Sequence, residues 1–428
     1  MPGSSQSKRL VDIDSGELFL PWRKSGAGPG PETLLVAVGD VMLDRQVGVW
    51  IRERGPEHPF LPVLSLLRQG DLVFGNLENP ISSDRSSPLP GKRINFCAVP
   101  EAADGLARAG FKVMTMANNH MMDYGPAAMR ETMHLLAQRG IRHVGAGANL
   151  GEAREPAICE VRGLRVAFLG YNSPDQEVEA TDARPGLAPA RLDLVLEDIR
   201  EAKRKADVVA VSLHRGLEFS PYPLPDQQHE CRRMVEAGAD LILGHHPHDP
   251  QGVELWRGGL IFHSLGHFVL DWEPPVSRWE KERFRRSRDW GLLVQVWLTR
   301  HGVSRARVLP IRQNGSCQAE LLEGPAKQQA LRGLRHLSWP LNQERLNRIV
   351  WRHGGEWLRF QFDSHRFHWR NGLSRRRWLR SFARWGTSDL VVRMLWGRLT
   401  GAELPDWALS LKNSLLGRAA AAARGLGL

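Results

Sequence analysis

Short β-rich runs alternate with helical patterns along the first three quarters of the chain. The runs have strand length and end in glycine or polar residues, and segments such as 125–138, 192–205 and 226–237 between them have helical spacing. The predicted strands are 34–38, 72–74, 113–116, 165–169, 208–213, 241–243 and 260–263, with closing strands at 292–299 and 308–311. Strands that alternate with helices predict an α/β fold with a largely buried sheet.

Polar side chains recur just after these strands. The residues concerned are Asp40, Glu78, Asn119, His214, His246 and His248. Ligands of open α/β folds bind outside the carboxyl ends of the strands, so we expect these side chains to converge at one sheet edge. Carboxylate, amide and imidazole donors together can hold a divalent ion of hard or borderline character. Each residue taken alone is more typical of a cap or turn.

The turn between two of these histidines is rigid. Pro247 separates His246 from His248 and fixes the turn, so both rings can point at one site. The spacing does not decide which of His245, His246 and His248 bind a metal and which transfer protons.

Charge divides the chain into two parts. The 428 residues carry 58 Lys+Arg and 47 Asp+Glu, a formal +11, yet residues 330–428 alone hold 18 basic and 6 acidic side chains. The remaining body is therefore nearly neutral. Eight of the fifteen tryptophans also lie in this basic tail. The tail suits an Arg-rich helical subdomain packed on the body, a groove for a peptide substrate, or a nucleic-acid or membrane surface.

Several classes of protein are disfavoured by what the sequence lacks. No run approaches the roughly 18 apolar residues of a membrane span, and the first thirty residues lack the apolar core of a secretory signal. The four cysteines form no C-x-x-C pair. We therefore expect a cytoplasmic protein with reduced thiols and no stable nucleic-acid or membrane partner.

Six motifs resemble the ordered motif set of CapA-type proteins. This family is named for poly-γ-glutamate capsule synthesis and is related to the calcineurin-like metallophosphoesterases. The resemblance covers roughly residues 33–312 and implies a calcineurin-like metallophosphoesterase α/β sandwich. The motifs are VGDVML (38–43), GNLENPI (75–81), ANNHMMDYG (117–125), SLHRGLEF (212–219), GHHPHDPQ (244–251) and SLGHF (264–268).

The expected domain organisation follows from this coverage. Residues 1–32 are predicted to be a flexible leader and 33–325 a CapA-like metal-dependent catalytic domain. The charged, aromatic stretch 272–290 is expected to form a lid, and 326–428 a basic helical C-terminal extension rich in Arg and Trp.

The resemblance also implies roles for individual residues. The expected metal ligands are Asp40, Glu78, Asn119, His214 and His246. The expected catalytic residues are His120, Asp123, His246 and His248. In the family pattern the Asn119 amide meets the metal and His120 stays free, so Asp123 can orient His120 for general acid or base work. The alternative is a helix-start network with a turn at 123–125.

Departures from the phosphoesterase pattern change the expected chemistry. The first motif has Met42 in place of a histidine, and Asn76 stands where a bridging aspartate is expected. Two cations repel strongly without anionic ligands between them, so we expect one divalent ion. Ca²⁺ is favoured, with Mn²⁺, Mg²⁺ and Zn²⁺ as alternatives. Arg215 and His267 replace a Trp and an Asn usual in relatives, and we expect them to bind substrate.

One ion beside several His and Asp residues suits proton abstraction next to a carbonyl. The chain resembles cytoplasmic CapA relatives that epimerise a residue of a ribosomally made lasso-peptide precursor. We therefore predict a metal-dependent peptide epimerase, an isomerase that converts an L residue to D. The alternatives are a metallohydrolase or transferase acting on poly-γ-glutamate, amide or phosphoester substrates, and a binding protein with a vestigial site.

Overall fold

The computed structural model describes residues 10–21, 32–90, 92, 94–173, 178–271 and 289–343. The chain divides into two compact units, the first formed by Met1–Pro275 and Phe284–Gln343. The second, formed by Val276–Arg283 and Glu344–Leu428, lies outside the described residues. All described residues therefore belong to the first unit.

The first sheet has eight strands, in the order β16-β15-β14-β1-β2-β3-β4, with β13 pairing on β1. β1 to β4 are parallel neighbours and β13 is parallel to β1, whereas β14, β15 and β16 join in antiparallel fashion. The strands are β1 (Thr33–Val41), β2 (Leu72–Leu77), β3 (Val113–Thr115), β4 (Arg142–Val144), β13 (His267–Val269), β14 (Gly291–Thr299), β15 (Gly302–Gln313) and β16 (Ala319–Leu321).

The second sheet has six strands, in the order β11-β12-β10-β9-β7-β6. Its four central strands are parallel and its two edge strands are antiparallel to their neighbours. The strands are β6 (Ala157–Val161), β7 (Leu164–Asn172), β9 (Val208–His214), β10 (Leu241–His245), β11 (Val253–Trp256) and β12 (Gly259–Phe262), and a separate pair is formed by β5 (Ala146–Gly147) and β8 (Gly186–Leu187).

A hydrophobic core joins the two sheets face to face. In β1, Leu35 and Ala37 point into this core, while Val36 and Val38 belong to a second cluster on the opposite face, as the two-residue period of a strand requires. The rings of Phe74 on β2 and Phe168 on β7 stack with centroids 5.4 Å apart. Such offset stacking adds to the free energy gained by burying the rings.

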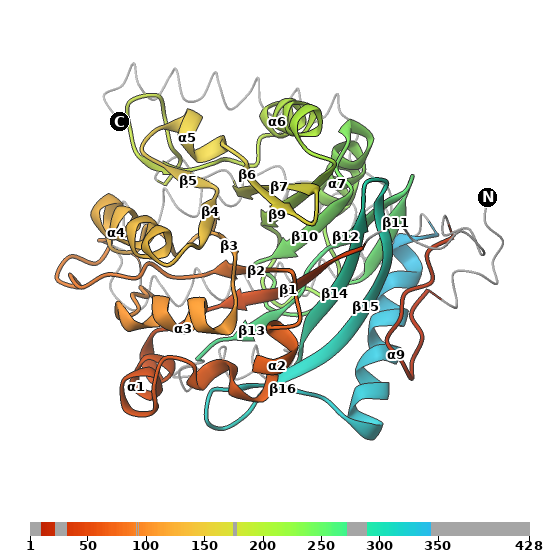
Figure 1. Ribbon diagram of the computed structural model, residues 1–428, viewed down its shortest axis with the longest axis horizontal. Helices are drawn as coiled ribbons and strands as arrows, with labels where there is room; N and C mark the ends of the chain where they lie inside the picture. The colour runs from red at the N-terminus through yellow and green to blue at the C-terminus, as the bar shows by residue number, and fades with distance from the viewer. Residues whose placement is uncertain are drawn as a thin grey trace, which may run out of the picture. The chain divides into compact units, whose positions relative to one another are not determined.

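Helices cover the outer faces of both sheets (Figure 1). This order of helices, sheet, sheet and helices confirms the predicted α/β sandwich. On the first sheet lie α1 (Arg45–Arg54), the 3₁₀ helix η2 (His58–Val63), α2 (Leu64–Leu67), α3 (Glu101–Ala109) and α4 (Gly125–Gln138); on the second lie α5 (Leu150–Arg154), α6 (Leu192–Lys205) and α7 (Pro225–Ala237). The predicted strands and the three predicted helices all appear. Their bounds shift by at most three residues, except that β15 begins six residues before the predicted strand 308–311.

Part of the predicted leader is packed on the body. Leu10, Val11, Leu18 and Leu20 are buried in the core between the sheets, and Glu17 pairs with Arg307 of β15 as an isolated bridge. Its three leucines and one valine give this segment enough apolar surface to pack on the body. The prediction of a flexible leader rested on the glycine and proline residues around it and missed these apolar side chains. The rest of the leader, 1–9 and 22–31, lies outside the described residues.

The helix at the start of the predicted extension also belongs to the body. α9 (Gly324–Leu341) buries Ala330, Leu331 and Leu334 in the same core between the sheets. The boundary expected at 325 therefore lies within a continuous packed structure that runs to at least residue 341. The remainder of the predicted extension and residues 272–288 of the predicted lid lie outside the described residues.

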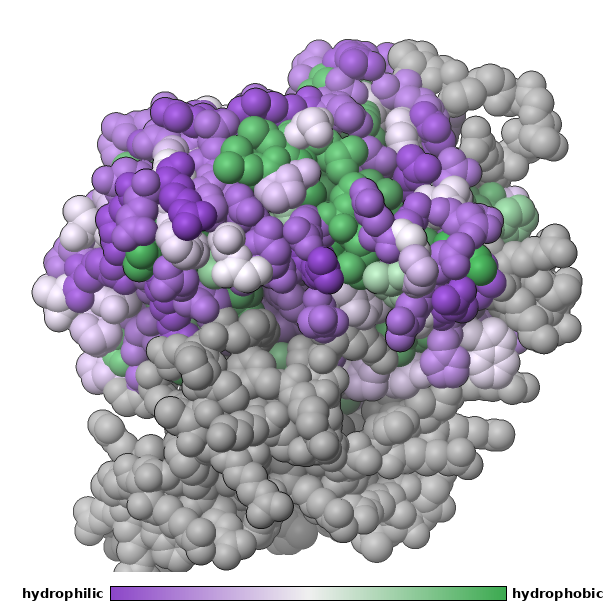
Figure 2. Space-filling view, turned by 90° about the horizontal axis from the view of Figure 1, so that it is seen from below, coloured by the Kyte–Doolittle hydropathy of each residue, from purple (hydrophilic) through white to green (hydrophobic). Residues whose placement is uncertain are grey.

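The surface of the described body is mixed. Figure 2 shows one face that is mostly hydrophilic and is interrupted by a hydrophobic area. Phe19 and Leu61 are large hydrophobic side chains that are each 50% exposed. Within the described ranges, none of the helices has both the length and the apolar content needed to cross a bilayer.

The burial of α9 makes a quantitative prediction. Leu331→Ala removes a fully buried side chain, so it should lower the free energy of unfolding by about 2–5 kcal/mol. Gln329→Ala, on the exposed face of the same helix, should change it by less than about 0.5 kcal/mol. Urea unfolding followed by circular dichroism measures both. Equal stability of the two variants would show that α9 does not contribute to the core.

Candidate metal centre

The site forms where strands of both sheets end. Asp40 is near the end of β1, Glu78 follows β2, and His214 is the last residue of β9. His246 and His248 follow β10, and Asn119 follows β3. The side chains predicted from strand ends are thus supplied by two sheets rather than by one, and the face-to-face packing brings them together.

A close backbone approach places Asp40. The backbone N–H of Asp40 donates to the Gly266 carbonyl over 3.1 Å, which joins β1 to the loop before β13. A Cβ atom on Gly39 would lie 1.9 Å from the same carbonyl oxygen. Only glycine fits at position 39, because any side chain would separate the two segments and move Asp40.

Asp40 is fully buried and linked to several partners. Its Oδ1 accepts a 2.8 Å hydrogen bond from Asn76, and its Oδ2 lies 3.0 Å from His248 Nδ1. His245 Nδ1 lies 3.2 Å from Oδ1. Burial raises the pKa of Asp40, but His245 and His248 outweigh burial and hold this pKa well below its usual range. Asp40 is therefore an anion in the folded protein.

Glu78 has no hydrogen-bond partner for its side chain among the described residues. It is fully buried, and no described residue makes a hydrogen bond to either carboxylate oxygen. The nearest imidazole nitrogens lie beyond hydrogen-bonding distance, with His214 Nε2 at 3.8 Å and His248 Nε2 at 3.7 Å from Oε1. Burial and then repulsion by Asp40 raise the pKa of Glu78 well above its usual range. A buried carboxylate without a partner destabilises a fold unless a cation compensates for it.

His214 presents one nitrogen to the same space. Its Nδ1 faces the Asn76 amide nitrogen at 3.2 Å, which directs Nε2 towards Asn119 Oδ1 at 3.0 Å and His246 Nδ1 at 3.2 Å. All five predicted ligands, Asp40, Glu78, Asn119, His214 and His246, are therefore linked by contacts in one cluster. Oxygen and imidazole donors in this combination fit a divalent cation.

His248 joins this cluster more closely than its predicted proton-transfer role implies. Asp40, Glu78 and His248 offer three ligand atoms that all lie within 4.8 Å of one another. Glu78 and Asp40 overcome the effect of burial and raise the pKa of His248 to about 9. His245 is fully buried beside Asp40, and neither of its ring nitrogens makes a hydrogen bond within the described residues. His248 therefore lies close enough to Asp40 and Glu78 for the three to hold one ion, and which of His245, His246 and His248 bind a metal stays a prediction.

The turn that carries these histidines is strained. His246 and His248 have φ angles of 93° and 59°, in the left-handed region that non-glycine residues rarely adopt. Such conformations persist only where surrounding contacts hold them, and they concentrate at functional sites. Here the contacts of His246 with His214 and of His248 with Asp40 hold the turn.

Asn76 is fully engaged in hydrogen bonds. Its amide nitrogen donates to Asp40, and its Oδ1 accepts a 3.0 Å hydrogen bond from Asn118. The side chain at the position expected for a bridging aspartate is therefore neutral and orients other residues.

A second buried unit lies beside the cluster. Asp123 Oδ2 lies 2.7 Å from His120 Nδ1 and also accepts a hydrogen bond from the Phe96 backbone. Asp123 Oδ1 pairs with Lys92 Nζ at 2.5 Å. Burial lowers the pKa of His120 to about 4, Lys92 acts in the same direction, and Asp123 opposes them. His120 is therefore neutral at pH 7, with its Nδ1 occupied and its Nε2 left as the nitrogen that can accept a proton.

Lys92 is not among the predicted site residues. It lies in a loop, follows no predicted strand, and falls outside the six motifs, so no pattern in the sequence singles it out. Besides Asp123, its Nζ contacts the Asn119 carbonyl at 2.6 Å and His120 Nδ1 at 3.2 Å. Lys92 thus connects the His120–Asp123 unit to the loop that carries Asn119.

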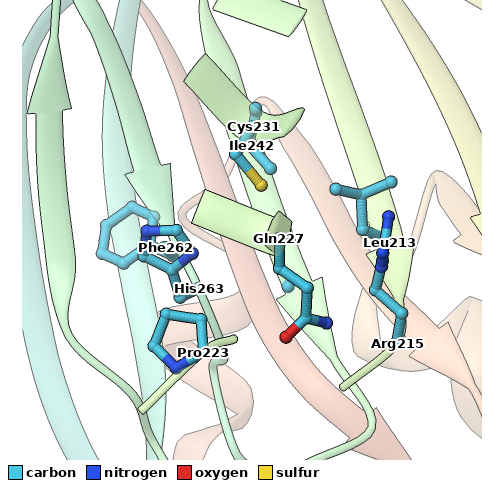
Figure 3. Close-up of a pocket in the computed structure, with 9 residues that line it drawn as sticks. Leu213, Arg215, Pro223, Gln227, Cys231, Ile242, Phe262 and His263 are labelled. Carbon is cyan, nitrogen blue, oxygen red and sulfur yellow. The ribbon is translucent and has the colours of Figure 1, made fainter. Parts of the chain in front are cut away.

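The two predicted substrate-binding residues have protein partners. Arg215 forms an ion pair with Glu230 of α7 and lines a pocket of about 10 Å³ with Gln227 and Pro223 (Figure 3), which has room for a water molecule at most. The ring nitrogen Nδ1 of His267 lies 2.9 Å from the His248 carbonyl oxygen, and the side chain is buried. Substrate contacts for both residues stay a prediction.

Known proteins resemble most of the described body. A family model described as bacterial capsule synthesis protein PGA_cap matches residues 34–272. The PGA biosynthesis protein CapA of Bacillus subtilis (strain 168) is 34% identical over 296 residues, 69% of this chain and 75% of that protein. The capsule biosynthesis protein CapA of Bacillus anthracis is 34% identical over 66% of this chain and 68% of its own. A solved structure of a putative 5′-nucleotidase from Staphylococcus aureus covers 72% of this chain and 58% of its own, with 15% identity and a TM-score of 0.39.

The buried carboxylate makes a prediction about metal removal. In the presence of EDTA, Glu78→Gln should unfold at the same temperature as the wild type or higher, because it removes a buried ionisable group that lies beside Asp40 and has no described hydrogen-bond partner. Saturating Ca²⁺ or Mn²⁺ should stabilise the wild type by about 2–4 kcal/mol and the variant by much less. Thermal unfolding with and without each ion measures both effects.

Glu53→Gln serves as the matched control, because Glu53 is exposed on α1. It should respond to EDTA and to the ions as the wild type does. An equal gain in unfolding temperature for Glu78→Gln and the wild type would exclude Glu78 as a ligand.

Proposed function

Because this chain belongs to the bacterial capsule synthesis protein PGA_cap family, we propose that it is a metal-dependent enzyme acting on a peptide or polyamide. The observation that carries this proposal is the buried Glu78 carboxylate, which has no described hydrogen-bond partner and stands between His214 and His248. Asp40, Glu78, Asn119, His214 and His248 would hold one divalent cation. When bound, this ion supplies positive charge that polarises a carbonyl group and stabilises negative charge on its oxygen.

The reaction we propose is epimerisation at Cα. Neutral His120 takes the proton from the Cα–H bond through Nε2, and Asp123 stabilises the resulting imidazolium. Inversion then needs a proton delivered to the opposite face of the same carbon. His246, the less buried of the two histidines that follow β10, is the proposed donor. Burial, and then His248, lowers the pKa of His246 to about 4, so it delivers a proton that it takes up only transiently.

The network around Asn76 favours this reaction over phosphoester hydrolysis. Two-metal hydrolysis needs an anionic ligand between the ions, and the neutral Asn76 is occupied by Asp40 and Asn118. A single cation beside a neutral base is sufficient for proton transfer next to a carbonyl. The finer form of the proposal is L-to-D conversion of one residue in a ribosomally made precursor peptide, such as that of a lasso peptide.

A second candidate is hydrolysis or transfer at an amide bond of poly-γ-glutamate. It is favoured by the 34% identity to the PGA biosynthesis protein CapA, of which this chain covers 75%. The same cation and the same His120 would serve, with a water molecule or an amine as the nucleophile.

Incubation in D₂O separates the two candidates. Synthetic peptides with free C-terminal carboxylates and γ-linked glutamate oligomers should be tested with Ca²⁺ and with Mn²⁺. Epimerisation should introduce one deuterium at a single Cα and a D residue, without a change in peptide connectivity. Mass spectrometry and chiral amino-acid analysis measure this. New peptide termini without deuterium at Cα would contradict epimerisation and support the hydrolase candidate.

His120 should be essential for either reaction. His120→Gln should lower kcat by about 10²–10⁴-fold, because it removes the base while keeping a side chain of similar length. Metal content, measured by elemental analysis, should stay at the wild-type value. His134→Gln on the exposed face of α4 is the matched control and should keep full activity. Full activity of His120→Gln would remove His120 from the mechanism.

A further inference from the structure

An open cleft lies beside the His120–Asp123 unit and is not used by the proposed chemistry. Its volume is about 620 Å³, large enough for several atoms of a peptide side chain or terminus. Its walls come from α1 and the residue before it, the loop between β2 and α3, and the residue before α4. The lining residues that matter here are Asp44, Arg45, Arg52, Arg85, Asn95 and Tyr124.

One end of the cleft adjoins the proton-transfer unit. The Phe96 ring lies with its centroid 4.4 Å from that of His120, and the Arg45 guanidinium lies 4.6 Å from the same Phe96 centroid. The guanidinium and the imidazole are therefore at most about 9 Å apart, the sum of these two distances. An extended chain covers this in roughly two to three residues. Asn95 also donates a 2.9 Å hydrogen bond to the Lys92 carbonyl, which ties the wall to the unit.

The cleft carries excess positive charge. Asp44, its acidic residue, pairs with Arg85 at 2.5 Å and accepts a hydrogen bond from the Cys97 backbone, so both its oxygens are engaged. Arg45 and Arg52 add two further guanidinium groups to the lining. Arg52 is exposed and forms no ion pair with a carboxylate in the described part of the chain. The lining therefore holds three guanidinium groups against one carboxylate, and Arg52 is the exposed one with no carboxylate partner in the described ranges.

The backbone of Arg45 is strained. Its φ is 54°, in the left-handed region, although it is the first residue of α1 and is not glycine. Strain of this kind is retained at ligand-binding positions when surrounding contacts hold it. Here it places the guanidinium over the ring of Phe96, and this ring in turn contacts His120.

We propose that this cleft binds a carboxylate of the substrate, with Arg45 and Arg52 as the groups that recognise it. The planar guanidinium pairs with carboxylates through two parallel hydrogen bonds, which selects their geometry as well as their charge. The carboxylate lies about two or three residues from the reacting Cα, and this spacing rests on the proposed function. The substrate is therefore a peptide with a carboxylate, either a side chain or a C-terminus, close to the reacting residue.

Calorimetric titration of the full-length, Ca²⁺-loaded protein tests this site with three N-acetylated peptides. Ala-Ala-Glu-Glu amide carries two side-chain carboxylates, and Ala-Ala-Gln-Gln amide carries no carboxylate. Ala-Ala-Gln-Gln free acid carries only a terminal carboxylate. The wild type should bind at least one carboxylate peptide more tightly than the uncharged amide. Arg45→Gln and Arg52→Gln should each weaken that binding about tenfold or more and leave the uncharged peptide unaffected.

Arg200→Gln, on the exposed face of α6, is the matched control and should bind as the wild type does. Preference for the first or the third peptide distinguishes side-chain from terminal recognition. Unchanged affinity in both Arg45→Gln and Arg52→Gln would overturn the site, and would indicate binding to arginines elsewhere, such as those in residues 344–428. Equal affinity of the wild type for all three peptides would overturn it as well.

Failure of this inference can be told from failure of the proposed function. Binding is measured without turnover, so the carboxylate effect can appear even if no peptide exchanges deuterium in D₂O. In that case the cleft stands as a carboxylate site and epimerisation fails. Deuterium exchange with unchanged affinity in the arginine variants would support the function and overturn the cleft.

Discussion

A buried carboxylate without a hydrogen-bond partner is the constraint on which the site depends. Glu78 is fully enclosed where the two sheets meet, and its backbone N–H donates to the Val41 carbonyl at the end of β1, so it cannot turn away easily. Burying this charge is costly unless a cation compensates for it. The imidazoles of His214 and His248 stop 3.8 Å and 3.7 Å from it, which leaves room for an ion among them. The strained turn that carries His246 and His248 is maintained around this space.

The neutral amide side chains of the site lie beside the Asp40 and Glu78 cluster, and the His120–Asp123 unit is a separate group of contacts. Asn76 and Asn118 link Asp40 to the backbone of β2 through hydrogen bonds without adding charge. The carboxylates of the cluster are therefore Asp40 and Glu78, while Asp123 contacts His120 and Lys92 instead. In the proposed mechanism, different residues would therefore bind the cation and transfer the proton, although Asn119 and His120 are neighbours in the chain.

The core of this protein extends beyond the part that matches the family model. The match ends at residue 272, yet Leu292 and Val294 of β14 and Leu331 of α9 complete the core between the sheets. The segment 10–21 packs against the same core from the other end of the chain. Because these segments are buried together, the packed structure that supports the site includes more of the chain than the part that carries the six motifs.

The sequence by itself determined the alternation of strands and helices, the strand ends that carry Asp40, Glu78 and His214, and the pairing of His120 with Asp123. These are local, since hydrophobic period and strand-end position can be read within a few residues. The tertiary structure alone decided that two sheets share the site, that Lys92 joins it, that His248 lies against Asp40 and Glu78, and that α9 belongs to the core. Those outcomes depend on which segments meet across the fold and on the φ angles of one turn, and no spacing along the chain encodes either.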